Sequence, residues 1–365
     1  MKLNRVGVAA GVLLTVTALA ACSSSGSKKD NGSGGSADTA CSKGTLNGEG
    51  STAQANAMTQ WINDYTKKCT DAKINYNPTG SGQGVSDFNA GQVDFAGSDS
   101  ALNPSKGEVA AANKACGSAA LDLPMVVGPI ALAYNISGVN DLVLTPELVA
   151  KIFTGKIKTW NDPAIAAKNS GVKLPSSAIN VIYRSDASGT TANFETFLSA
   201  TDKADFTAEP AKDNAQKVFA GQGVAKSQGV ASAIKQTSGS IGYVEYSFAV
   251  NGSLQTAKLD NGAGPVEVNK ASASAAVASA KVVGTGNDLS LSLDYNTKAK
   301  GAYPLILVTY EIACTKYKDS ATGTFVKNFL NYTAGAGQDS LAQLGYAPIP
   351  SELLGKVKAS IAKIG

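Results

Sequence analysis

The chain has 365 residues, which is enough for two domains of ordinary size. Its 32 basic and 28 acidic residues give a net charge of +4, too small for the strongly basic surface that binds nucleic acid. The absence of histidine and of a Gly-x4-Gly-Lys-Ser/Thr motif excludes a Ser-His-Asp triad, a His-ligated metal site and a P-loop.

Residues 1–21 predict a cleaved export signal. Two basic residues precede a short apolar run that ends in Leu19-Ala20-Ala21-Cys22, the plan of a signal peptide. Those four residues resemble a bacterial lipobox, in which the signal is cut before the cysteine and the cysteine is acylated. An ordinary signal cleavage with an incidental cysteine is the alternative. Residues 22–40 are rich in Ser and Gly and predict a flexible tether, so we expect a domain held at the membrane by a lipid on Cys22.

Strand and helix signals alternate through the rest of the chain. A strand is expected at 44–48, and the spacing of Met58, Trp61, Ile62 and Tyr65 predicts one face of a helix. Further elements are expected as strands at 74–76, 93–96 and 179–183, helices around 85–88 and over 270–281, and helix starts at Pro104, Pro146 and Pro163. The two longest apolar runs, 125–134 and 305–312, predict buried strands. This alternation indicates α/β architecture.

Three predicted strand-to-helix turns share a composition of Gly, Ser and Thr: 48–53, 80–84 and 184–191. The first N–H groups of a helix lack internal partners and carry partial positive charge, while glycine permits close approach of a ligand. One such turn alone is equally well explained as a capped helix. Three together predict several helix N-termini that converge on one phosphate-like oxyanion, with Arg184 as the cation.

Asp99 lies just past the predicted strand 93–96. A carboxylate beside an anion site is compatible with that site only if the anion carries a proton. From its position alone, Asp99 is more simply interpreted as a helix cap or a turn residue.

Four cysteines remain if Cys22 is acylated, and outside the cytoplasm an even number favours two disulfides. Three pairings are possible, and four buried free thiols are the alternative. Cys41 precedes the first strand and Cys69 ends the helix that returns from it, so both are expected on the same side of the sheet. This favours Cys41–Cys69 and leaves Cys116–Cys314.

The loops, their order and their spacing resemble the phosphate-binding subunit of bacterial phosphate ABC transporters. The likeness covers about residues 44–350 and includes the segments 158–163, 239–246 and 345–350. It implies a type II periplasmic-binding-protein fold, an α/β fold of two lobes with a ligand cleft between them. The implied lobes are 41–131 plus 303–365 and 132–302, with crossing strands within 125–134 and 305–312.

The resemblance also implies a phosphate site. The implied ligands are Thr52, Ala53, Ser81, Asp99, Arg184, Ser188, Gly189 and Thr190, with Asp186 paired to Arg184. Thr52 would act through its hydroxyl and Ala53 through its backbone N–H. The family often has Phe where this chain has Ala53, a change that keeps a backbone contact and loses any packing of the ring. Asp99 would accept the proton that phosphate still carries near neutral pH and would repel sulfate, which carries none.

The function implied by the resemblance is that of a solute-binding protein without enzymatic activity, cofactor or metal. It would capture inorganic phosphate and deliver it to the permease subunits of an ABC transporter. We expect a monomer, lipid-anchored on the extracytoplasmic face of the cell membrane, with no nucleic-acid partner. One alternative is a binder of another tetrahedral oxyanion such as sulfate, against which Asp99 argues. The other is a surface hydrolase, which without histidine would be limited to Lys or carboxylate schemes.

Overall fold

A computed structural model describes residues 39–365 of the chain. The predicted signal peptide, Cys22 and nearly all of the predicted tether lie outside the described residues. The elements up to the first long strand are β1 (Gly44–Gly50), α1 (Ala55–Lys68), β2 (Ala72–Asn77), α2 (Ser81–Asn89), β3 (Phe95–Ser98), the 3₁₀ turn η1 (Pro104–Lys106), α3 (Glu108–Cys116) and β4 (Ala120–Asn135).

The middle of the chain contains shorter elements. They are β5 (Val143–Leu144), α4 (Pro146–Phe153), α5 (Pro163–Lys168), β6 (Asn180–Arg184), α6 (Gly189–Thr201), α7 (Ala215–Val218), β7 (Gln222–Val224), α8 (Lys226–Gln236), β8 (Ser240–Glu245), α9 (Tyr246–Gly252), β9 (Gln255–Thr256), β10 (Lys258–Asp260) and β11 (Pro265–Val266). The last elements are α10 (Lys270–Val277), β12 (Lys281–Val282), β13 (Leu291–Ser292), β14 (Ile306–Cys314), α11 (Ser320–Thr333), α12 (Gln338–Leu341), η2 (Ala342–Leu344) and α13 (Ser351–Ile361).

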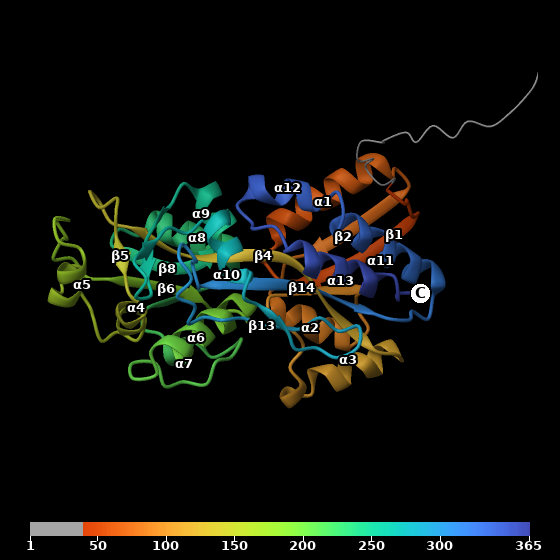
Figure 1. The fold of residues 1–365 in the computed structure, drawn as a ribbon, viewed down its shortest axis with the longest axis horizontal. Helices are drawn as coiled ribbons and strands as arrows, with labels where there is room; N and C mark the ends of the chain where they lie inside the picture. Colours follow the sequence, from red (N-terminus) through yellow and green to blue (C-terminus); the bar gives the residue numbers. More distant parts are fainter. Residues whose placement is uncertain (1–38) are drawn as a thin grey trace, which may run out of the picture. The chain divides into compact units, whose positions relative to one another are not determined.

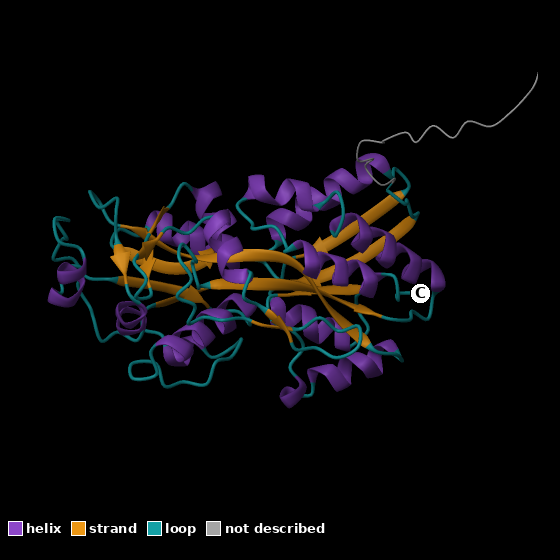
Figure 2. Cartoon of the chain, viewed as in Figure 1, coloured by secondary structure: helices purple, strands orange, loops and turns teal. Residues whose placement is uncertain are grey.

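Two antiparallel strands, β4 and β14, join two parallel sets of strands in the main sheet. The strand order is β2-β1-β3-β14-β4-β8-β6-β7, with β9 also paired to β4. β1 is parallel to β2 and β3, and β6 is parallel to β7 and β8. Helices cover both faces of the strands (Figure 2), which confirms the predicted α/β class. Both ends of the described chain lie in the same half of the fold, and residues of about 140–260 form the other half (Figure 1).

The two crossing strands are the longest buried segments, as their apolar runs predict. Every residue of β14 is buried, and only the two end residues of β4 are partly exposed. A strand that is covered on both faces is continuously apolar rather than alternating, because neither set of side chains faces water. The registers of β14 with β4 and of β4 with β8 tie the two halves of the sheet together.

Buried side chains form two large clusters, consistent with the predicted two-lobed architecture. One contains Trp160, Phe194 and Tyr243. The other contains Trp61 and Phe329. The exact lobe boundaries remain a prediction. A third, smaller cluster packs α10 against β14, so the segment that precedes β14 contacts the crossing strands directly.

Two disulfides close the half of the fold that holds both chain ends. Cys41 is bonded to Cys69 and Cys116 to Cys314, the pairing that the sequence favours. Cys41 precedes β1 and Cys69 follows α1, as the strand–helix geometry requires. The second bond spans a much longer separation, 198 residues against 28, and links the end of α3 to the end of β14.

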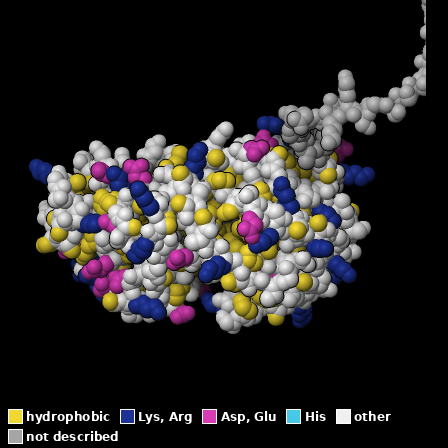
Figure 3. Space-filling model, viewed as in Figure 1, with side chains coloured by type: hydrophobic (Ala, Val, Ile, Leu, Met, Phe, Trp, Pro, Cys, Tyr) yellow, Lys and Arg dark blue, Asp and Glu magenta, His cyan; other side chains and the backbone are white. Residues whose placement is uncertain are grey.

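Within residues 39–365, no helix is both long enough and apolar enough to cross a membrane. Charged side chains of both signs are scattered over the face shown in Figure 3, without a broad area of one sign.

Candidate functional site

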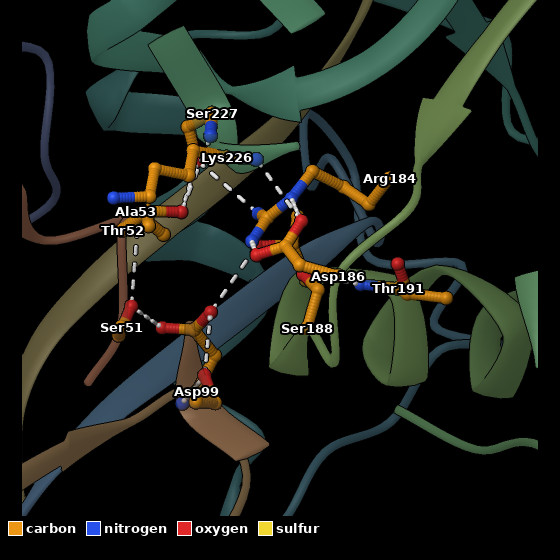
Figure 4. A network of polar contacts seen from close by, with 12 residues as sticks. Ser51, Thr52, Ala53, Asp99, Arg184, Asp186, Ser188, Thr191, Lys226 and Ser227 are labelled. Atoms are coloured by element: carbon orange, nitrogen blue, oxygen red, sulfur yellow. Dashed lines mark hydrogen bonds and ion pairs between the residues drawn. The ribbon is translucent and has the colours of Figure 1, made fainter. Parts of the chain in front are cut away.

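The site lies where strand-to-helix turns from both parallel strand sets meet. β1 leads to α1, β6 to α6 and β7 to α8, while the turn after β2 leads to α2. Since the turns leave the carboxyl ends of parallel strands, the N-terminal ends of the helices come together at one edge of the sheet. The side chains of this region form a connected network of polar contacts (Figure 4).

Asp99 is the centre of one end of the network. Its side chain is buried, with 2% of the residue exposed. Oδ1 accepts hydrogen bonds from the hydroxyls of Ser51 and Thr309, the latter at 2.9 Å. Oδ2 accepts from Ser81 at 3.3 Å and from Thr190 at 3.1 Å. Four hydroxyls from four separate segments therefore converge on one carboxylate, which is not the arrangement of a helix cap or a surface turn.

Burial raises the pKa of Asp99 above its usual value. The hydrogen bonds from Ser51 and Thr309 and the positive charge of Arg184 act in the opposite direction without cancelling the effect. Such a carboxyl group is a good acceptor for a proton and a poor neighbour for an anion that has none to offer.

Arg184 is the centre of the other end. It is also 2% exposed, and its Nε and Nη2 donate to the two oxygens of Asp186 at 2.7 and 2.5 Å. The backbone N–H of Lys226 donates to the same carboxylate at 3.0 Å. Burial raises the pKa of Asp186, but the hydrogen bonds and charge of Arg184 outweigh it, so this pKa lies below its usual value. Asp186 thus remains ionised and orients the guanidinium group.

The turns approach one another closely enough to require glycine at several positions, of which Gly189 is next to Asp99. A Cβ atom on Gly189 would lie 2.7 Å from the Cβ of Asp99 and 2.8 Å from the Oγ of Ser81. These distances are far shorter than van der Waals contact, so any side chain at 189 would separate the α6 end from Asp99 and Ser81. The N–H of Gly82 also donates to the carbonyl of Ala187 at 3.0 Å, which joins the second and third turns.

The remaining predicted residues lie on the same network. Thr52 Oγ1 is 2.9 Å from Ser227 Oγ and accepts from the N–H of Ser227 at 3.2 Å. The N–H of Ala53 donates to Ser51 Oγ at 3.1 Å. Ser188 caps α6, because its hydroxyl accepts from the N–H of Thr191 at 3.3 Å. The structure therefore brings the predicted residues together, and their role as phosphate ligands remains a prediction.

Sequence reasoning missed several residues of this network. Ser227 receives a hydrogen bond from Nη1 of Arg184 at 3.4 Å and contacts Thr52 from the opposite side. The segment 221–229, which runs through β7 into the first turn of α8, contains three glycines and Ser227 and could have been identified as a fourth such segment. Thr309 had no comparable signal, because a threonine within the apolar run of β14 looks like an ordinary β-branched strand residue.

Lys226 has a left-handed backbone conformation, with φ of 67°. A non-glycine residue in this region is strained and persists only where its surroundings fix it. Here the N–H of Lys226 donates to Asp186, and the N–H of Ser227 donates to Thr52.

Among the described residues, no group of three or more acidic or cysteine side chains could hold a metal ion.

Comparisons with known proteins also point to a binding protein. A profile of the PBP superfamily domain matches residues 35–336. The phosphate-binding protein PstS 3 of Mycobacterium tuberculosis is 44% identical over 377 residues, which cover 100% of both chains. The phosphate-binding protein PstS 3 of Mycobacterium leprae is 43% identical over 372 residues, which cover 99% of each chain.

Solved structures give the same fold. A periplasmic phosphate-binding protein, PfluDING, solved with bound phosphate, aligns with a TM-score of 0.71 and 23% identity over 86% of this chain and 93% of its own. The ancestral soluble variant of the human phosphate binding protein aligns with a TM-score of 0.72 and 21% identity, over 87% of this chain and 93% of its own.

The fold and the polar network define a two-lobed solute-binding protein of the PBP superfamily, a binding protein rather than an enzyme. The PstS 3 relatives match the whole chain at 43% and 44% identity, which identifies one family within this superfamily. The chain belongs to the PstS family of phosphate-binding proteins.

Proposed function

We propose that this protein captures inorganic phosphate outside the cytoplasm and delivers it to the membrane permease of a phosphate ABC transporter. The observation that carries the proposal is a buried carboxylate, Asp99, and a buried guanidinium group, Arg184, at the two ends of one polar network where several helix N-termini meet. The PstS relatives are named phosphate-binding proteins, and the periplasmic phosphate-binding protein PfluDING, which has the same fold, was solved with phosphate bound.

Phosphate would be held mainly by neutral donors. Arg184 carries one positive charge, and Asp186 and Asp99 carry two negative charges when both are ionised, so these three groups do not attract an anion by net charge. Instead the N–H and O–H groups of the turns would bind it: the hydroxyls of Thr52, Ser81, Ser188 and Thr190 and the backbone N–H groups of Ala53 and Gly189. Ser81 and Thr190 would turn their protons from Asp99 to the anion, and the Ala53 N–H would leave Ser51. Dipoles that are fixed by the fold bind an anion without a large loss of conformational entropy.

Asp99 would supply the selectivity. Hydrogen phosphate can donate its proton to this carboxylate, whereas sulfate would place like charge and lone pairs against it. Sites built on a specific hydrogen bond reject analogues that lack it by roughly 10⁴–10⁵-fold. Sulfate binding, the second candidate function, is disfavoured for this reason.

We also propose that residues 41–131 plus 303–365 and residues 132–302 move as two lobes that close on the ion. Contacts such as that between Thr52 and Ser227 would form on closure.

Near the N-terminus, Cys22 would carry the lipid, and two or more acyl chains give stable membrane attachment. If so, Cys22→Ser should leave the membrane fraction or remain unprocessed, and unchanged fractionation would contradict the anchor. Gel filtration should find a monomer.

Calorimetric titration of the purified protein tests the binding proposal. We expect heat of binding with phosphate at neutral pH and none with sulfate at the same concentration. Incubation with a chromogenic phosphate monoester should release no phosphate. Equal binding of the two anions, or turnover of the ester, would contradict the proposal.

A further inference from the structure

Two segments that the resemblance marks, 239–246 and 345–350, meet at a buried polar cluster outside the proposed ligands. Tyr346 donates from its hydroxyl to the carbonyl of Ala53 at 2.8 Å and lies 3.1 Å from the hydroxyl of Ser247. Ser247 in turn donates from its N–H to Glu245 at 3.0 Å and from its hydroxyl to the same oxygen. Asn56 of α1 donates to the Ser247 hydroxyl at 2.7 Å.

The cluster of Glu245, Ser247, Tyr346 and Asn56 joins the two large cores. Tyr346 belongs to the core that contains the α1 residue Trp61. Ser247 lies on α9, whose Phe248 belongs to the other core. The loop that carries Tyr346 also approaches the start of α9 closely, since a Cβ on Gly345 would lie 3.5 Å from the Cα of Ser247.

Burial makes the polar groups of this cluster costly unless they are hydrogen-bonded, as Oε2 of Glu245 is and its Oε1 is not. Glu245, Ser247 and Tyr346 have no exposed surface. Burial raises the pKa of Glu245 to about 8, so its carboxyl group is largely neutral at pH 7. Buried polar groups fix a particular geometry because each loses its full hydration if its partner moves away. The cluster is therefore suited to holding two packed units in one relative position.

The cluster contacts the first turn at Ala53, which is a residue of the proposed phosphate site. Ala53 has no side chain with which to hold its own position beyond one methyl group, and its N–H is one of the proposed phosphate donors. The hydroxyl of Tyr346 holds the carbonyl of that same residue. This bond fixes the peptide between Ala53 and Gln54, whereas the Ala53 N–H belongs to the preceding peptide and donates to Ser51 Oγ. The bond therefore acts on the N–H indirectly, because it limits rotation of the chain at Ala53.

We propose that Tyr346 and Ser247 are positioning residues for phosphate, and that with Glu245 and Asn56 they form a latch between the two lobes behind the first turn. The latch rests on the proposed phosphate function. It fixes the backbone of Ala53 and stabilises the closed arrangement of the lobes. Its loss therefore weakens phosphate binding mainly through faster release, because the latch stabilises the arrangement that holds the ion.

Tyr346→Phe tests the latch, because it removes only the hydroxyl and leaves the ring in the core. Its matched control is Tyr303→Phe, since Tyr303 is equally buried and donates to a backbone carbonyl, that of Ile130 at 2.9 Å, without touching the proposed site. We expect Tyr346→Phe to raise the Kd for phosphate by about ten-fold, the loss of one hydrogen bond of ordinary strength. Stopped-flow measurements should place most of that change in the dissociation rate. Tyr303→Phe should lower the melting temperature and keep the wild-type Kd.

Asn56→Ala provides a second test if Tyr346→Phe does not fold, because Asn56 is only partly buried and alanine suits its place in α1. It should also raise the dissociation rate. In a double-mutant cycle, the effects of Asn56→Ala and Tyr346→Phe should be less than additive, because the side chains of both residues contact the Ser247 hydroxyl.

The outcomes separate the latch from the function. If the wild-type protein binds no phosphate, the proposed function fails. If the wild type binds phosphate and both Tyr346→Phe and Asn56→Ala keep its Kd and dissociation rate, the latch is wrong and the function stands. Equal weakening by Tyr303→Phe would also overturn the latch, because it would show a general effect of lost stability.

Discussion

The two ends of the site are equally buried but differ in their charges: one holds an acid surrounded by neutral hydroxyls, and the other holds an ion pair. Asp99 and Arg184 each have 2% exposure. The Asp99 end has a carboxylate surrounded by neutral hydroxyls, and its pKa is raised. The Arg184 end has a guanidinium group that is already neutralised by Asp186, whose pKa is lowered. The acid at one end thus has a raised pKa, whereas the ion pair at the other end keeps its charges.

This difference indicates a division of labour. A guanidinium group that is held in place by its partner offers N–H donors in a fixed direction to any tetrahedral oxyanion. It therefore adds affinity but discriminates little between phosphate and sulfate. A buried carboxylate that no cation neutralises directly adds little affinity and discriminates by the proton of the ligand. Affinity should therefore respond to changes at the Arg184 end, and the choice of anion to changes at the Asp99 end.

Arg184→Ala should have the largest effect on affinity. Loss of a charged hydrogen-bonding partner weakens phosphate binding by roughly 1.5–3 kcal/mol, and a sulfate preference should not appear. Calorimetry on this variant measures both. Lys168→Ala is the control for removal of a paired cation, because Lys168 forms an ion pair with Asp260 and takes no part in the site. Wild-type affinity in Arg184→Ala would remove this residue from the site.

Acidic pH should relax the choice of anion. The pKa of Asp99 lies above its ordinary value of 3.8, so Asp99 gains a proton before Asp186 does as the pH falls. A protonated Asp99 can donate to sulfate, and sulfate affinity should rise by up to about ten-fold per pH unit while that proton is taken up. Sulfate titrations from pH 7 towards pH 4 check this. Sulfate affinity that stays flat over this range would show that Asp99 does not control the choice.

Thr309→Val should have a smaller effect, confined to the Asp99 end. The Thr309 hydroxyl stabilises the ionised form of Asp99, so its loss should raise the pKa of Asp99 further and move the onset of sulfate binding to higher pH. The loss of one buried hydrogen bond should also lower the unfolding free energy by about 1 kcal/mol.

Thr191→Val is the matched control for Thr309→Val. The Thr191 hydroxyl is also buried, but it lies 2.6 Å from the hydroxyl of Tyr243, on the Arg184 side. The control should cost similar stability and leave the onset of sulfate binding where it is. An equal shift in both variants would mean that the two ends are not separate.

The sequence predicted the parts of this site that lie on local patterns. Gly, Ser and Thr at strand-to-helix turns have a direct physical reason, and the predicted loops meet as expected. The pairing of Cys41 with Cys69 followed from the positions of one strand and one helix. The α/β class and the two crossing strands followed from periodicity and apolar runs.

Contacts that depend on the packing of distant segments were not predictable in this way. Thr309 reaches Asp99 only because β14 lies beside β3 in the sheet, an order that local patterns do not reveal. Ser227 contacts Thr52 across 175 positions of sequence. For Asp99 itself, position alone favoured a cap or a turn, and only the four converging hydroxyls show a buried acceptor site.

Competition between phosphate and sulfate for the Asp99→Asn variant tests the central claim most directly. The amide keeps the shape of the side chain, removes its negative charge and offers a donor to sulfate. We expect the phosphate-to-sulfate preference to narrow by at least about ten-fold while phosphate affinity changes less, since an isosteric change of one hydrogen bond with a charged group is worth about 1.5–3 kcal/mol. An unchanged preference, accompanied by a lowered melting temperature, would show that Asp99 has only a structural role and does not select the anion.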